Sequence, residues 1–142
     1  MKYLFRLLLL SFCAVSTPSV YPAETKAIAE KDSAGAKRLA GTYAGKWMTD
    51  AIEGTLRLKL QQVGAAWTGE SSFTYDGAEI PTKVVRVKVE GTKIEVVIAW
   101  DSQGTPAETR LTGELSGEKI EGTFQSKVAN ETTAGKWNAT RT

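Results

Sequence analysis

The sequence has no histidine, and its single cysteine, Cys13, lies close to the N-terminus. Without these residues the chain has no disulfide framework and no zinc site built on Cys or His. It also lacks the thiolate nucleophile and the histidine base that many enzymes use. Any recognition or chemistry therefore depends on aromatic rings, amides, hydroxyls, amines and carboxylates.

An excess of charge of one sign is also missing once the N-terminus is set apart. Lys2 and Arg6 precede a short apolar run that ends in small residues such as Ala14, which is typical of a secretory signal peptide. We therefore expect residues 1–16 to direct export to the periplasm or the medium. Their removal takes two of the 18 basic residues and none of the 16 acidic ones, so the mature chain is nearly neutral. A neutral chain without a basic stripe is not expected to bind nucleic acid.

Two features next to the signal peptide bear on how the protein is attached and organised. The apolar run is too short for a stable membrane span. Lipidation of Cys13 is not expected either, because Phe12 stands where a lipobox has a small residue. Residues 17–40 are polar and alanine-rich without an apolar stripe, which predicts a linker.

From Gly41 onward the chain consists of short runs of β-forming residues separated by glycine signals. Leu56, Leu58 and Leu60 alternate with polar residues, which predicts one face toward a core and one toward water. The pattern has no helical periodicity and predicts eight strands. They cover residues 42–48, 55–63, 66–74, 81–90, 92–100, 108–115, 119–126 and 135–141.

The hairpins can be aligned from charge and apolar pairing. A type II′ turn at Gly91 places Lys88 opposite Glu95 on the outside and apolar residues opposite one another inside. Gly64 and Gly117 predict similar tight turns. The remaining links are expected to be longer loops at the opposite end of the strands; they are residues 49–54, 75–80, 101–107 and 127–134.

Closure of the sheet would remove its two open edges, and eight strands is a number that closes. We therefore predict that residues 41–142 form an all-β, eight-stranded antiparallel up-and-down barrel. Val85 is expected to point inward with Val87 and Val89. Val84, Val97 and Ala99 are expected to form a modest outer apolar patch, consistent with a monomer or a weak oligomer. The residue ranges of the eight strands and the registers of the three hairpins are the specific predictions of this fold.

Aromatic residues gather at the loop end of this predicted barrel. They form either a cup for a small, partly apolar ligand or a plug that fills the interior, and the sequence leaves both open. The candidate ligand-binding residues are Trp47, Asp50, Phe73, Tyr75, Trp100, Asp101, Gln103, Phe124 and Trp137.

The first and last strands carry a resemblance to known barrels. Gly45-Lys46-Trp47 on the first strand and Arg141 closing the last resemble the calycins, which include the lipocalins and avidins. The resemblance implies a small ligand-binding barrel. Thr49 stands where avidins have an asparagine after this tryptophan, and Leu111 and Phe124 stand where they have tryptophans, so biotin is not the expected ligand.

The carboxylates offer two further hypotheses. Glu114 is predicted to lie opposite Glu121, as paired catalytic carboxylates do in glycosidases, but on the outer face without a pocket. Asp50, Asp76 and Asp101 lie in three separate loops, where they either converge on a cation or simply form turns; the turn interpretation is favoured. No metal and no cofactor is expected.

Two asparagines, Asn130 and Asn138, match the glycosylation sequon, and the sequence alone does not show whether the source organism uses them. The sequence thus predicts an exported, non-enzymatic β-barrel protein that binds a small ligand at its loop end. The alternative is a protein-interaction module, such as an inhibitor or an envelope accessory protein, that uses the same loops.

Overall fold

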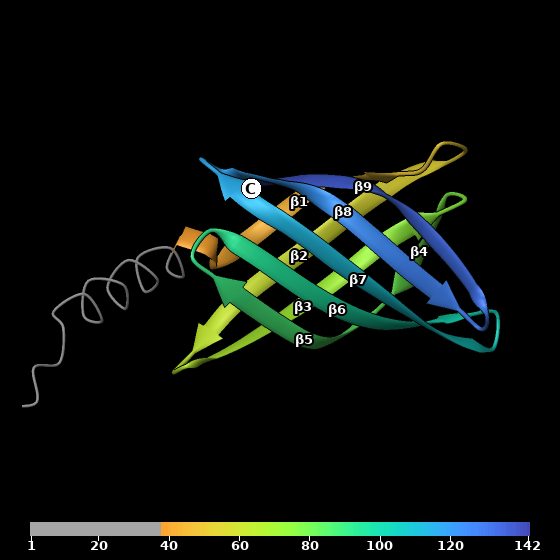
Figure 1. Cartoon of the computed structure of the whole chain (residues 1–142), viewed down its shortest axis with the longest axis horizontal. Coiled ribbons are helices and arrows are strands. Elements are labelled where there is room, and N and C mark those ends of the chain that lie inside the picture. Colours follow the sequence, from red (N-terminus) through yellow and green to blue (C-terminus); the bar gives the residue numbers. More distant parts are fainter. Residues whose placement is uncertain (1–37) are drawn as a thin grey trace, which may run out of the picture.

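The computed structural model describes residues 38–142, so the expected signal peptide and most of the expected linker lie outside the described residues. The described residues form one antiparallel sheet with the strand order β4-β3-β2-β1-β9-β8-β7-β6-β5. This sheet coils into a nearly closed up-and-down barrel (Figure 1). Its strands are β1 (Gly41–Met48), β2 (Glu53–Val63), β3 (Ala66–Tyr75), β4 (Ala78–Pro81), β5 (Lys83–Glu90), β6 (Lys93–Ser102), β7 (Thr105–Ser116), β8 (Lys119–Val128) and β9 (Glu131–Arg141).

The hairpin registers agree with those expected from the sequence. Lys88 lies opposite Glu95 in the β5–β6 hairpin, and Gly91 has the positive φ of 62° that its turn requires. The β2–β3 and β7–β8 hairpins also have the predicted pairing. The first and last strands pair with each other, with Trp47 opposite Trp137. The prediction of an all-β antiparallel up-and-down barrel is confirmed.

Residues 38–142 contain nine strands rather than eight, because β4 forms within residues 75–80, where a long loop was predicted, and takes only Pro81 from the predicted strand over residues 81–90. β4 pairs with β3, whereas β5 pairs with β6, and Thr82 lies between them. Pro81 has no backbone N–H, so it cannot donate to a ladder and is suited to the end of an edge strand. The chain therefore changes partner at this proline.

The change of partner leaves a seam in the barrel wall between β3 and β5. Among residues 38–142 no ladder pair joins these two strands. Instead, the Thr82 hydroxyl donates to the carbonyl oxygen of Ser71 at 2.7 Å and contacts the Ser71 hydroxyl. A Cβ added to Gly69 would lie 3.7 Å from Val84 Cγ2, so the seam is packed although it is not hydrogen-bonded as a sheet.

The loop end of the barrel is plainer than predicted. Three of the four links expected to be long loops are two-residue turns, at residues 76–77, 103–104 and 129–130. Asp76 and Gly77 have φ values of 49° and 76°, as in a type I′ hairpin turn. Asp-Gly is a strong hairpin signal, so the prediction of a longer loop over residues 75–80 is wrong. Residues 49–52 are the longest link at this end.

The inward face of β5 also differs from the prediction. A bulge between Val84 and Arg86 reverses the alternation, so Val84 packs against the core and Val85 is 58% exposed. The predicted apolar patch is therefore wrong. Val97 faces outward but is only 4% exposed, and it lies between Arg86 and Arg110 on the neighbouring strands. Arginine stems commonly cover apolar neighbours in this way.

The base of the barrel is filled by a compact apolar core. Leu39, which the sequence assigned to the linker, is fully buried in it. Tyr43 donates its phenol hydrogen to the carbonyl oxygen of Leu39 at 3.0 Å. Arg141 closes the base, with its guanidinium 5.1 Å from the centre of the Tyr43 ring and 2.6 Å from the carbonyl oxygen of Ala40. The closing arginine thus stacks on Tyr43 rather than on Trp47.

Two glycines allow the sheet to curve sharply. A Cβ on Gly45 would collide with the carbonyl oxygen of Asn138 on β9, and one on Gly122 would collide with that of Thr112 on β7. Any larger residue would force the backbones apart at these points. Glycine at such close approaches is a common means of bending a barrel wall.

Candidate functional site

The barrel interior contains a cavity of about 430 Å³ at its loop end. Its lining residues come from every strand except β5, and Thr49, Ile52 and Gln103 of the links between strands complete its rim. Inward positions alternate along each strand, which is why one face of so many strands contributes. The base is packed while the loop end is open, so the interior is a cup rather than a plug over its full depth.

Aromatic rings from several strands meet in the cavity wall. Trp47 lies edge-to-face with Phe73 and Phe124, at centroid distances of 6.3 and 5.9 Å. Trp100 lies edge-to-face with Phe73 at 5.2 Å. Tyr75 is nearly parallel to Trp47 at 6.2 Å, with an angle of 6° between the planes. Edge-to-face pairs hold the rings in fixed directions, so the cavity has defined walls.

The indole of Trp47 has a fixed position because its N–H is satisfied. Its Nε1 donates to the carbonyl oxygen of Thr74 at 3.0 Å. The absence of a side chain at Gly54 makes this approach possible, since a Cβ there would come close to the indole nitrogen. The ring therefore presents its carbon face, and not a polar group, to the cavity.

A small polar group interrupts the apolar wall. Trp100 Nε1 donates to Thr109 Oγ1 at 3.0 Å, and this hydroxyl lies 2.5 Å from Ser126 Oγ. Both hydroxyls line the cavity, and Thr109 is 6% exposed. Neither hydroxyl was among the residues predicted from the sequence to bind a ligand. Strand alternation could have indicated them, because Thr109 and Ser126 each lie two residues from an inward-facing apolar residue on the same strand.

The rim of the cavity combines exposed apolar side chains with carboxylates. Ile52 is 44% exposed and Tyr75 is 49% exposed, although both line the cavity. Asp101 and Glu131 are the charged residues among the lining residues, and both are exposed. Asp101 Oδ1 also accepts the N–H of Gly104 at 2.6 Å, so this carboxylate orders the turn that carries it.

The structure brings most of the candidate residues together. Those that line the cavity are Trp47, Phe73, Tyr75, Trp100, Asp101, Gln103 and Phe124. Asp50 lies in the link of residues 49–52 but not in the lining. Trp137 faces inward but is buried in the wall, where its indole donates to the carbonyl oxygens of Thr112 and Thr123 at 3.0 and 3.1 Å.

Glycines explain why Trp137 does not reach the cavity. A Cβ at Gly113 would lie 2.8 Å from Trp137 Cζ2, so the indole occupies the space that a side chain on β7 would fill. Strand alternation correctly predicted that this ring points inward. It could not show that the ring lies against the wall.

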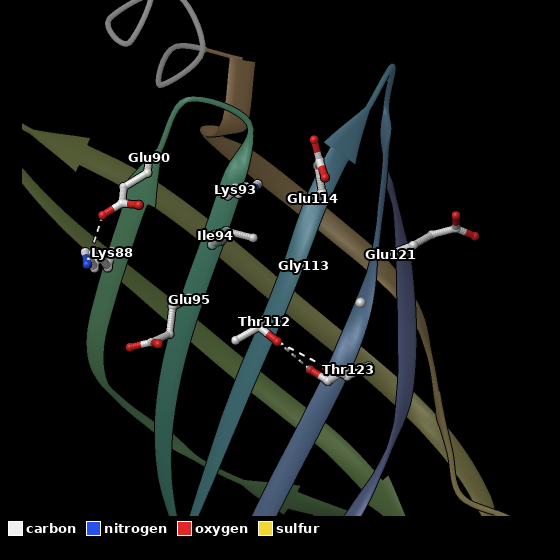
Figure 2. A pocket seen from close by; sticks show the side chains of 11 residues that line it. Lys88, Glu90, Lys93, Ile94, Glu95, Thr112, Gly113, Glu114, Glu121 and Thr123 are labelled. Carbon is white, nitrogen blue, oxygen red and sulfur yellow. Dashed lines mark hydrogen bonds and ion pairs between the residues drawn. The ribbon is translucent and has the colours of Figure 1, made fainter.

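A second, more open hollow of about 410 Å³ lies on the outer face of β5 to β8 (Figure 2). Glu114 and Glu121 lie opposite each other here, as predicted, but their side chains extend in different directions (Figure 2). Thr92 donates to Glu114 at 3.2 Å, and Lys119 forms an ion pair with Glu121. This arrangement provides no enclosed space between the two carboxylates in which a scissile bond could lie.

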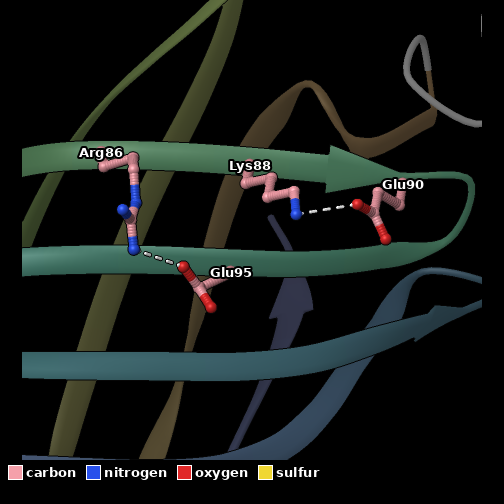
Figure 3. A network of polar contacts seen from close by, with 4 residues as sticks. All are labelled: Arg86, Lys88, Glu90 and Glu95. Atoms are coloured by element: carbon pink, nitrogen blue, oxygen red, sulfur yellow. Dashed lines mark hydrogen bonds and ion pairs between the residues drawn. The ribbon is translucent and has the colours of Figure 1, made fainter.

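The ion pairs on the same face do not join the residues that lie directly opposite each other in the β5–β6 ladder (Figure 3). Lys88 pairs with Glu90 on its own strand at 2.9 Å, and Arg86 pairs with Glu95 at 2.7 Å. The hydrogen bond from Lys88 lowers the pKa of Glu90, and the same bond raises the pKa of Lys88. All four side chains are at least partly exposed, so water screens these pairs.

Within residues 38–142, no group of three or more Asp or Glu side chains is arranged to hold a metal ion. Asp76 lies in a hairpin turn and Asp101 accepts a turn N–H, as the turn interpretation requires. None of the described residues forms a helix long and apolar enough to span a membrane.

The fold and the cavity define an antiparallel up-and-down β-barrel with an aromatic cup at one end. Comparison of the chain with protein-family models, curated proteins and solved structures finds no match. The barrel is compatible with the calycin architecture. A function is therefore proposed from the geometry of the cavity and not from a relative.

Proposed function

We propose that this protein is an exported, non-enzymatic binding protein that holds a small, partly apolar molecule in the aromatic cup. The observation that carries the proposal is the cavity of about 430 Å³ at the loop end. It is large enough for a ligand of drug-like size, and its lining is mostly apolar with a few polar groups, as in typical ligand sites. Aromatic rings of the cavity that remain partly exposed keep apolar surface in contact with water, which is unfavourable, and a bound ligand would bury that surface.

The polar groups would orient such a ligand. The Thr109 and Ser126 hydroxyls lie in the wall, where each can exchange a hydrogen bond with a polar atom. Gln103 at the rim offers an amide that donates and accepts. With no histidine or mature cysteine and no enclosed carboxylate pair, the lining supplies groups for recognition rather than for a reaction.

The proposal is tested with the neutral apolar dye N-phenylnaphthylamine, whose emission rises when it leaves water. The purified mature protein should enhance the emission with saturation. Val128 lines the cavity, so Val128→Trp should fill part of it and weaken dye binding by about tenfold or more. Binding that survives this substitution unchanged would show that the dye binds elsewhere, and no saturable binding by the wild type would refute the cup as a ligand site.

A matched control lies one residue away on the same strand. Lys127 is exposed and does not line the cavity, so Lys127→Trp adds the same ring to the outside and should leave dye binding unchanged. Equal melting temperatures of the two variants and the wild type would exclude a loss of structure as the cause.

A second candidate is a protein-interaction module, favoured by the exposure of Ile52 and Tyr75 at the rim. A protein partner that binds only this rim would be insensitive to Val128→Trp, because that ring fills the interior. The two candidates therefore give opposite results with the same variant.

A further inference from the structure

We infer that the ligand of the aromatic cup is an organic cation, such as an alkyl- or arylammonium group attached to an apolar body. This inference rests on the proposed function, because it concerns the class of ligand that the same cavity takes. Three features of the molecule support it: the aromatic rings of the cavity, the charged residues that line it, and the distribution of charge along the barrel.

The rings provide the first argument. Five aromatic side chains line one cavity: Trp47, Phe73, Tyr75, Trp100 and Phe124. The face of an aromatic ring carries negative potential and attracts cations placed over it. Because Trp47 and Trp100 donate their N–H groups to protein oxygens, their positive edges are occupied and do not repel a cation in the cavity.

The charged residues of the lining provide the second argument. Asp101 and Glu131 line the cavity, and within the part of the chain that the structure describes no lysine or arginine does so. Two carboxylates at the rim disfavour an anionic ligand and favour a cationic one. The apolar rings below them would accommodate the uncharged part of the molecule.

The distribution of charge along the barrel provides the third argument. The loop end comprises residues 47–54, 74–79, 101–106 and 127–132, and the base end comprises residues 38–42, 62–67, 89–94, 115–120 and 139–142. The acidic residues of the loop end are Asp50, Glu53, Asp76, Glu79, Asp101 and Glu131, and its basic residue is Lys127. The base end carries Arg38, Lys93, Lys119 and Arg141 against Glu90 and Glu118.

The barrel therefore has a negative end and a weakly positive end, although the mature chain is nearly neutral. Such a separation produces a field that draws cations toward the negative end and repels anions from it. The negative end is the one at which the cavity opens. The same end thus attracts, admits and surrounds a cation.

The test uses three probes of one shape and different charge, which displace N-phenylnaphthylamine from the protein at a pH of about 6, where the phenols are protonated. They are meta-hydroxyphenyl trimethylammonium, the neutral meta-tert-butylphenol and the anionic meta-hydroxybenzenesulfonate. We expect the cation to displace the dye at a concentration about tenfold lower than the neutral probe, and the anion to be weakest.

Two substitutions separate the contribution of charge from that of shape. Asp101→Asn keeps an oxygen that accepts the Gly104 N–H, and Glu131→Gln keeps the size of an exposed side chain. Together they should weaken the cation by about three- to tenfold and leave the neutral probe unchanged. Glu118→Gln, which removes one carboxylate charge in a turn at the base end, should change neither.

Tyr75→Leu tests the aromatic contribution, because it removes a half-exposed ring while keeping an apolar side chain. It should weaken the cation by about threefold and affect the neutral probe less. Displacement by the neutral probe at the same or a lower concentration than the cation would overturn the inference while leaving the cup as a ligand site. Failure of the dye itself to bind would overturn the proposed function and the inference together.

Discussion

Tyr43 and Arg141 join the first and last strands at the base of the barrel, and the hydrogen bond that Tyr43 donates depends on the phenol being protonated. The phenol donates to the carbonyl oxygen of Leu39, and Arg141 donates to the phenol oxygen at 2.9 Å. Burial raises the pKa of the Tyr43 phenol, and the nearby Arg141 charge offsets this only in part. The folded state therefore retains the proton to higher pH than the unfolded chain does.

The sign of the resulting pH dependence follows from linkage. Below a pH of about 10 the phenol is protonated in both states and its contribution is fully present. As pH rises further, the unfolded chain ionises first, and the contribution is lost through the pKa of the folded state. We expect the free energy of unfolding of the wild type to fall more steeply above this pH than that of Tyr43→Phe.

The comparison is made by urea denaturation from neutral pH to about pH 11, a range that includes the ordinary pKa of a tyrosine phenol, about 10. Near pH 7, Tyr43→Phe should be less stable by about 1–2 kcal/mol, since it loses hydrogen bonds in a buried position. The gap should narrow at high pH. Parallel curves for the two proteins would contradict the linkage.

At the scale of the strand, the seam between β3 and β5 is the part of the wall that no ladder closes. The Thr82 hydroxyl supplies a hydrogen bond to Ser71 there, just after Pro81 has ended the pairing of β4. Thr82→Val keeps the shape but removes this bond, and we expect it to destabilise the protein by about 1–2 kcal/mol. Amide hydrogen exchange should accelerate first in β5 and in the first half of β3.

Thr82→Ser is the matched control, because it keeps the hydroxyl and should preserve most of the stability. If both variants exchange as the wild type does, the hydroxyl contact does not hold the seam.

At the scale of the molecule, the barrel is closed at its base by residues that precede the first strand. Leu39 is fully buried beneath the sheet. In the full mature chain, Leu39→Ala should lower the free energy of unfolding by about 2–5 kcal/mol, as expected for truncation of a buried leucine. Thermal or denaturant unfolding measures this directly.

Leu39→Met nearly conserves volume and should cost less than about 1.5 kcal/mol. A loss below about 1 kcal/mol in Leu39→Ala would contradict the buried position of this leucine. The cavity lies at the other end, so neither variant should alter the dye affinity measured for the wild type once the protein is folded.

Strand alternation and turn chemistry were sufficient to predict an all-β antiparallel up-and-down barrel, although with eight strands rather than the nine found in residues 38–142. The alternating leucines of β2 and the glycine turns at Gly64, Gly91 and Gly117 define local geometry that does not depend on distant contacts. Strand alternation also predicted the inward direction of four of the five rings that line the cavity, since inward positions on neighbouring strands converge in any closed barrel; these are Trp47, Phe73, Trp100 and Phe124.

Other features depended on contacts between segments far apart in the sequence. Only the folded chain shows that residues 78–81 pair with β3 and that the chain then changes partner at Thr82, because that depends on which edge each segment meets. Burial of Leu39 depends on the space left beneath Tyr43 and Arg141. Trp137 was diverted to the wall by Gly113, a residue on a strand two positions away in the sheet.

The absence of histidine, and of cysteine beyond position 13, limits residues 38–142 to rings, hydroxyls, amides, amines and carboxylates, and that restriction is a property of the sequence by itself. The sequence also determined the strands and their local registers, because alternation and glycine turns act between near neighbours. Tertiary structure decided that the base is packed and the loop end is hollow. It also decided that Asp101 and Glu131 line the hollow whereas Asp50 does not, because that depends on how each link folds at the opening.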